Sequence, residues 1–165
     1  DGKRRPIEWL GSGGYRPQNE RGTMAMVAQG PVEELLFGFT PEVLLLRLDL
    51  TGPARSVLSP TDSVHVIFQE PGGVEMIVRR PGQPDQSVWW HTAAGEAAEP
   101  TLRAAVDQVV SLGIPFALLG VAVDGPIRFA VEVREPGHVR DRVPRDASIV
   151  VQRPSLDFER INWDV

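Results

Sequence analysis

The stretch that decides the fold runs from residue 32 to residue 50 and reads VEELLFGFTPEVLLLRLDL. Apolar side chains alternate along its first arm and again along its second, which is the period of a β-strand with one buried face. Thr40-Pro41 lies between the arms, where proline pre-sets the backbone for a turn. The pattern predicts a β-hairpin with these inward residues: Leu35, Phe37, Phe39, Leu44, Leu46, Leu48 and Leu50.

The other face of the second arm is apolar only at its start. Val43 and Leu45 predict burial on both faces there, whereas Arg47 and Asp49 return that face to water or to polar partners. A hairpin this apolar is not stable alone and needs a second sheet to cover it.

Composition limits the class of protein. The chain has 165 residues, no cysteine, 15 prolines and 16 glycines, and its net charge is −5. This length suggests one domain, and the many turn residues are typical of short strands in a sandwich or barrel. The mild acidity argues against nucleic-acid binding, and no apolar run approaches the roughly 20 residues of a membrane span.

The absence of cysteine fits a reducing compartment, so we expect a cytoplasmic protein with no disulfide. The first residue is Asp and no signal sequence precedes it, so we expect a processed chain or a part of a longer protein.

Several further segments alternate like the hairpin. Leu102–Leu112 fits helical spacing as well as strand alternation, and its β-branched content favours a strand. Proline at the start and glycine at the end of 115–120 predict one short helical turn. The other predicted strands are 63–70, 74–80, 86–91, 126–135, 139–143 and 148–152.

These elements predict an all-β fold, a jelly-roll-like antiparallel β-sandwich with at most one short helical turn. We expect a single domain over residues 1–165, with an N-terminal arm at 1–22 and a C-terminal tail at 156–165 docked on the body. Residues 23–29 are a possible edge strand. The glycine-rich run at 11–14 predicts a flexible turn, not a phosphate-binding loop, because no helix pattern follows it.

Five segments in order carry a family resemblance. They are GYRP (14–17), LLLRLDL (44–50), IPFALLGV (114–121), FAVEV (129–133) and RVPRDASIVVQRPSLDFERINWDV (142–165). The chain resembles the C-terminal β-domain of glycoside hydrolase family 57, the amylase-like enzymes acting on α-glucans. That domain is similar to DOMON-like sandwiches and to family 9 carbohydrate-binding modules.

The resemblance implies a role as well as a fold. It implies that the catalytic barrel of a hydrolase or glucan transferase lies upstream, and that this part is a non-catalytic accessory domain that packs on it. The partners it implies are that catalytic domain and an α-glucan. The family's catalytic residues match no position here, so none is carried over. The alternative is a purely structural or protein-interaction sandwich with no ligand.

Aromatic side chains are the candidates for carbohydrate binding, because sugars stack their C–H faces on exposed rings. Trp89 and Trp90 are neighbours in a strand, so they point to opposite faces. Parity places Trp90 in the core with Val88, and leaves Trp89 outward beside Ser87 and His91. An outward Trp89 also fits packing under the N-terminal arm or against another domain. The candidate binding residues are Trp89, Trp9, Tyr15, Arg16 and His91.

No cofactor, metal or catalytic site is expected. Retaining glycosidases hold two carboxylates about 5–5.5 Å apart, whereas the adjacent Glu33 and Glu34 are predicted to point to opposite faces. The three histidines are scattered and no Ser-His-Asp order appears. Some DOMON relatives bind haem through Met and His, but Met76 fits the core better. The sequence does not decide whether an acidic loop such as residues 60–62 binds calcium. The remaining haem candidates by residue type are Met24, Met26 and His65.

Overall fold

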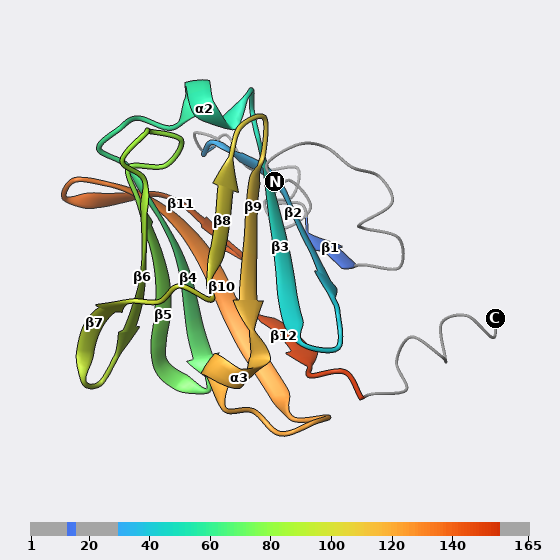
Figure 1. The fold of residues 1–165 in the computed structure, drawn as a ribbon. Helices are drawn as coiled ribbons and strands as arrows, with labels where there is room; N and C mark the ends of the chain where they lie inside the picture. The colour runs from blue at the N-terminus through green and yellow to red at the C-terminus, as the bar shows by residue number, and fades with distance from the viewer. Residues whose placement is uncertain (1–12, 16–29, 156–165) are drawn as a thin grey trace.

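The computed structural model describes residues 13–15 and 30–155. Within these ranges the chain forms two antiparallel sheets that face one another (Figure 1), which confirms the predicted all-β sandwich. The five-stranded sheet has the order β1-β2-β3-β9-β8. The seven-stranded sheet has the order β11-β10-β4-β5-β6-β7, and β12 also pairs with β10.

The strand bounds follow the predicted alternation closely. The five-stranded sheet contains β1 (Gly13–Tyr15), β2 (Val32–Phe39), β3 (Val43–Leu50), β8 (Arg103–Val106) and β9 (Val110–Pro115). The seven-stranded sheet contains β4 (Ser63–Glu70), β5 (Gly72–Arg79), β6 (Ser87–Thr92), β7 (Gly95–Ala98), β10 (Pro126–Glu135), β11 (His138–Val143) and β12 (Ile149–Gln152).

The predicted hairpin is confirmed as β2 and β3. The Oγ1 of Thr40 accepts a hydrogen bond from the N–H of Val43 at 3.0 Å and closes the turn. The four inward leucines of β3 are at most 2 % exposed. Burial of both faces at the start of β3 was wrong, because Val43 and Leu45 lie on the outer face beside Gly113, which has no side chain to cover them.

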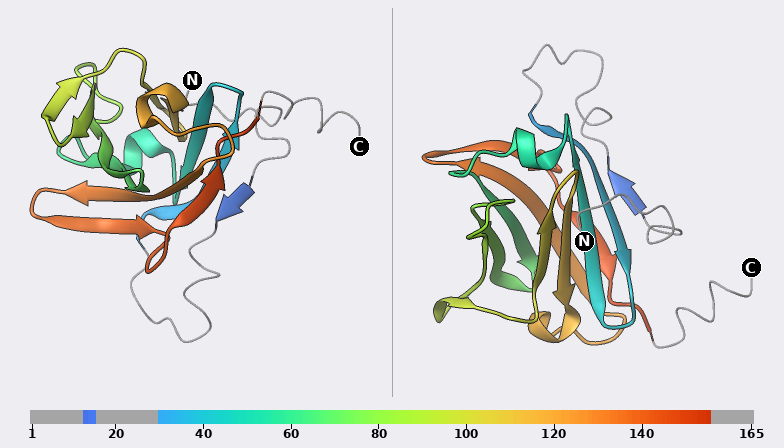
Figure 2. Two further views of the ribbon diagram at one scale, coloured as in Figure 1. Left: turned by 90° about the horizontal axis from the view of Figure 1, so that it is seen from below. Right: turned by 45° about the horizontal axis from the view of Figure 1, so that its top comes forward.

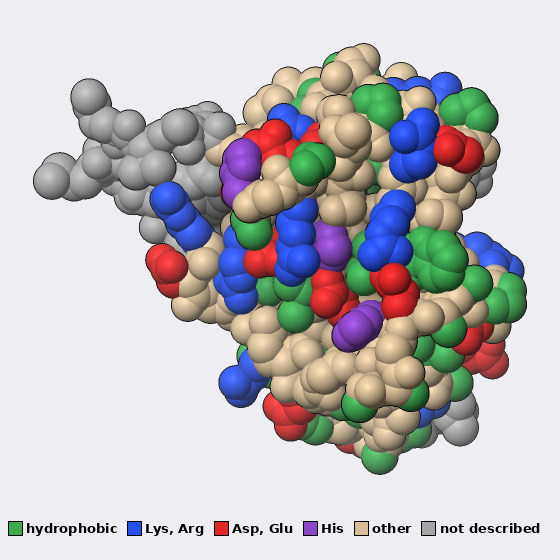
Figure 3. All heavy atoms as spheres, turned by 90° about the vertical axis from the view of Figure 1, so that its left-hand side faces the viewer, with side chains coloured by type: hydrophobic (Ala, Val, Ile, Leu, Met, Phe, Trp, Pro, Cys, Tyr) green, Lys and Arg blue, Asp and Glu red, His purple; other side chains and the backbone are tan. Residues whose placement is uncertain are grey.

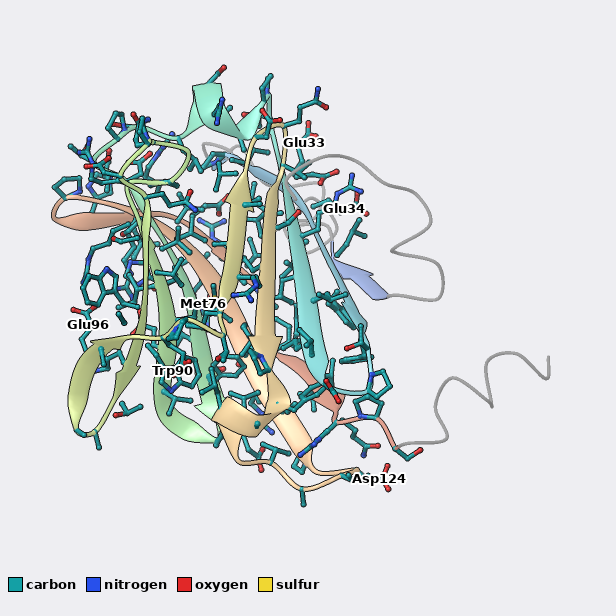
Figure 4. The ribbon with its side chains drawn as sticks, in the orientation of Figure 1. Glu33, Glu34, Met76, Trp90, Glu96 and Asp124 are labelled. Atoms are coloured by element: carbon teal, nitrogen blue, oxygen red, sulfur yellow. The ribbon has the colours of Figure 1, made fainter. Side chains whose placement is uncertain are left out.

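The core lies between the two sheets. Met76 and Trp90 point into it (Figure 4), and Met76 is fully buried. Aromatic rings join the layers, since Phe129 of the seven-stranded sheet lies 6.5 Å from Phe37 of the other sheet, edge to face. Such contacts add to the free energy of burial, which is about 25 cal/mol for each Å² of apolar surface.

Two four-residue helices lie at opposite ends of the sandwich (Figure 1). The predicted helical turn is α3 (Phe116–Leu119), which ends at Gly120 with a left-handed φ of 65°. The second, α2 (Ala54–Val57), lies in a connection that we expected to contain turns only. In the described part of the chain, neither helix is long and apolar enough to cross a membrane.

Three local predictions need correction. The single strand expected at 102–112 is a hairpin, because the chain turns between Val106 and Val110 and pairs β8 with β9. The backbone N–H groups of Ala54 and Arg55, at the start of α2, bond the carbonyls of this turn and hold it. Strand β7 was not predicted, and Gly13 lies in strand β1, not in a flexible turn. The edge strand at 23–29 and the docked tail lie outside the described residues.

One edge of the seven-stranded sheet is tied to the other sheet. β11 and β12 follow one another along the same side of β10 (Figure 2). Asp141 of β11 is buried, and its Oδ2 accepts a hydrogen bond from the N–H of Val32 at 3.0 Å. This bond satisfies a backbone donor at the start of β2 and joins the two layers.

Candidate functional site

Polar and charged side chains gather on the outer face of the seven-stranded sheet (Figure 3). Cross-strand register gives the rows on this face, since residues directly opposite in a sheet share a face. One row runs through Glu132, His65, Ile77 and Trp89. The next row runs through Arg134, Ser63, Arg79 and Ser87.

Trp89 is held in one orientation on this face. The parity prediction is confirmed, because Trp90 is buried at 8 % exposure while Trp89 is partly exposed on the outer face. The Nε1–H of Trp89 donates to Ser87 Oγ at 2.9 Å. The guanidinium carbon of Arg79 lies 5.8 Å from the indole centroid, and Arg79 is itself paired with Glu96 at 2.7 Å. The indole is thus oriented before any ligand arrives.

The other predicted binding residues fall in three places. His91 is exposed and shares the outer face with Trp89, so the structure brings these two together. The backbone of Tyr15 lies in β1, opposite Leu35 in the five-stranded sheet, and therefore belongs to the other layer. Trp9 and Arg16 lie outside the described residues.

A hydrogen-bonded chain of three side chains on the same face links His65 of the first row with Ser63 of the second row and with Glu75. Ser63 Oγ is 2.7 Å from His65 Nε2, and His65 Nδ1 is 2.5 Å from Glu75 Oε1. His65 is only 6 % exposed, so its ring is fixed by these two contacts and by its neighbours. In the neutral imidazole, Nδ1 carries the proton because a carboxylate only accepts, and Nε2 is then the acceptor of the Ser63 hydroxyl.

Charges around the chain keep Glu75 ionised. The hydrogen bond from His65 holds the pKa of Glu75 below its usual value of 4.5, although burial opposes this effect. The charges of His65, Arg134 and His91 act in the same direction as the hydrogen bond. Arg134 lies 3.9 Å from Glu75 and 2.6 Å from Glu132, so it neutralises both carboxylates in part.

The described residues that the sequence suggested for metal or haem binding are not placed together. In residues 13–15 and 30–155, no three His, Asp or Glu side chains are placed to hold a metal ion. Met76 is buried between the sheets, whereas His65 faces outward, so the two cannot ligate one haem. Met24 and Met26 lie outside the described residues.

The carboxylates considered from sequence have other roles. Asp62 is 3 % exposed, and its Oδ2 accepts from Ser59 N–H at 2.7 Å and from Arg140 at 2.5 Å, so protein groups already occupy the acidic loop. Glu33 and Glu34 lie near one end of β2 (Figure 4). The β2–β3 register shifts between Val32 and Glu34, which interrupts the alternation that predicted opposite faces.

A hollow of about 500 Å³ lies on the outer face of the five-stranded sheet. Gly113 forms part of its floor, between Leu45 and Arg103 on the neighbouring strands. Its lining is mainly apolar, and Arg103 is the single charged residue among the described residues that line it. It lacks the paired acid and base groups that the opposite face carries.

Sequence reasoning missed the Ser63, His65 and Glu75 chain for a geometric reason. Ser63 and His65 are two residues apart in a strand, so the sequence alone places them on one face. Glu75 joins them only through the β4–β5 register, in which His65 lies opposite Ile77 and diagonal to Glu75. The Pro71-Gly72-Gly73 sequence between the two strand patterns was the available signal for that register.

A scan against protein-family models and a search of curated proteins each found no match to this chain. The function must therefore be inferred from the side chains on the outer face of the seven-stranded sheet.

Proposed function

We propose that this domain is an accessory β-sandwich that binds carbohydrate on the outer face of its seven-stranded sheet. The observation that carries the proposal is Trp89, an indole partly exposed on a sheet face and fixed there by Ser87 and Arg79. A preoriented ring loses little conformational freedom when a ligand stacks on it. His91, Glu96 and Arg79 supply hydrogen-bonding groups for hydroxyls beside the ring.

The substrate class rests on the family resemblance. It favours an α-glucan as ligand and an upstream glycoside hydrolase or transferase domain as the covalent partner. In this proposal the domain holds polysaccharide and packs on that catalytic domain, which cleaves the glycosidic bond.

The test is calorimetric titration of the 165-residue chain with maltooligosaccharides and glycogen. We expect saturable binding that Trp89→Ala abolishes and Arg79→Ala weakens, because Arg79 no longer orients the indole. The matched control is Leu45→Ala, which removes a partly exposed apolar side chain from the outer face of the other sheet. Absence of binding at millimolar ligand would overturn the proposal.

The second candidate is a structural domain whose Trp89 face packs against another domain. Its support is the partial cover of the indole by Arg79, which places a charged group and an aromatic ring side by side on this face. This candidate predicts no response to any glucan, and it predicts that Trp89→Ala weakens association with the upstream domain.

A further inference from the structure

The chain of Ser63, His65 and Glu75 has the connectivity of an activated nucleophile. The hydroxyl contacts Nε2 of the imidazole at 2.7 Å, and the carboxylate contacts Nδ1 at 2.5 Å. In serine hydrolases the base takes the hydroxyl proton through one ring nitrogen, while an acid fixes the tautomer through the other. The order of contacts here is the same.

Each of the three groups has the environment that its role needs. His65 is 6 % exposed and its Nδ1 contacts the ionised Glu75, so the imidazole is held in one orientation. Ser63 lies at the first position of β4 and is partly exposed.

Two arginines occupy the cross-strand positions next to Ser63. Ser63 lies directly opposite Arg134 on β10 and directly opposite Arg79 on β5, on the same face. Their guanidinium groups are held by Glu132 at 2.6 Å and by Glu96 at 2.7 Å. Arginine side chains at these positions are the candidates to stabilise the negative charge that develops on the carbonyl oxygen of an ester.

We propose that this face carries an ester-hydrolysing site with Ser63 as nucleophile, His65 as general base and Glu75 as the residue that positions His65. The probe for this activity is an ester of a small acyl group such as acetyl, which needs no deep acyl pocket. The proposal goes beyond carbohydrate binding and does not depend on it, and it departs from the expectation that this chain has no catalytic residue.

The reaction balances with water as the second reactant. Ser63 Oγ attacks the ester carbonyl carbon while its proton passes to His65 Nε2. The tetrahedral intermediate breaks its bond to the alkoxide, which takes that proton from His65 and leaves as the alcohol. Water then attacks acyl-Ser63, gives its proton to His65, and the carboxylic acid leaves as the proton returns to Ser63 Oγ.

The test combines covalent labelling with turnover on the 165-residue chain. A fluorophosphonate should modify Ser63, as located by mass spectrometry of peptides, and p-nitrophenyl acetate should be hydrolysed with saturation. Ser63→Ala should remove both signals, and His65→Gln should lower kcat by about 100-fold or more, the usual contribution of a general base. Glu75→Gln should lower kcat with little change in KM, because the carboxylate that orients the His65 ring is gone and substrate contacts are unchanged.

The matched control is Ser111→Ala. Ser111 is another partly exposed strand serine, but it lies on β9 in the five-stranded sheet, opposite Arg47. The variant should keep both labelling and turnover. Circular dichroism and thermal unfolding establish that each variant is folded. Failure of the unmodified chain to label at Ser63, or equal turnover by Ser63→Ala, would overturn the proposal.

Discussion

His65 Nδ1 lies 2.5 Å from Oε1 of Glu75, although Glu75 stands diagonally across the β4–β5 hairpin and not opposite it. Diagonal neighbours in an antiparallel sheet are about 7–8 Å apart, which a glutamate side chain can span. The contact ties the two strands on their outer face and lowers the pKa of Glu75.

This pair predicts a pH dependence of stability. The pKa of Glu75 in the folded state lies below its usual 4.5, so its charged form stabilises the fold above about pH 4.5. That contribution is lost as the pH falls through the lower folded pKa. Urea unfolding of the wild type and of Glu75→Gln at pH 7 and at pH 3 should show a larger difference at pH 7. An equal difference at both values would contradict the assigned contact.

The hairpin core should be sensitive to truncation. Leu46 is fully buried at the centre of β3, so Leu46→Ala should lower the free energy of unfolding by about 2–5 kcal/mol. Val150→Ala is the control, because Val150 on β12 is 58 % exposed and its loss should cost at most about 0.5 kcal/mol. Urea denaturation measures both, and similar midpoints would show that β3 is not central to the core.

Two glycines should respond in opposite ways to alanine. A Cβ on Gly30 would clash with the carboxylate of Asp141, which accepts the N–H of Val32, so Gly30→Ala should destabilise the protein. A Cβ on Gly113 would meet its nearest neighbour at 3.4 Å, an ordinary contact, and Gly113→Ala should stabilise strand β9 by about 0.5 kcal/mol. Thermal unfolding compares the two, and a lower midpoint for Gly113→Ala would refute this view of the outer face.

Loss of Arg140 should lower the free energy of unfolding more than loss of Arg80, although both arginines form ion pairs. Its partner Asp62 is buried, so Arg140→Ala leaves a carboxylate without its charge partner and should cost about 1–3 kcal/mol. The double variant Arg140→Ala/Asp62→Asn should recover part of this loss, because the uncompensated charge is gone. The comparison is Arg80→Ala, whose pair with Asp85 is exposed and should contribute little. Chemical denaturation of all three variants decides the ranking.

Strand identity follows from the sequence by itself. Period-two alternation located β4 and β10 at their observed bounds, and Thr40-Pro41 set the turn of the central hairpin. The same alternation assigned Trp90 to the core and Trp89 to the outer face. These features are local, because side-chain direction in a strand depends only on position along it.

Pairing between distant segments was decided only by the tertiary structure. The turn between β8 and β9 depends on backbone N–H groups at the start of α2, which donate to the carbonyls of the turn. The link between the two sheets depends on the hydrogen bond from the N–H of Val32 to Asp141, 109 residues away in sequence. The contact between His65 and Glu75 depends on which residues of β4 and β5 lie opposite, and the sequence pattern is the same for other registers in steps of two. Alternation fixes the face of each side chain, whereas only the packed sheets fix its neighbours.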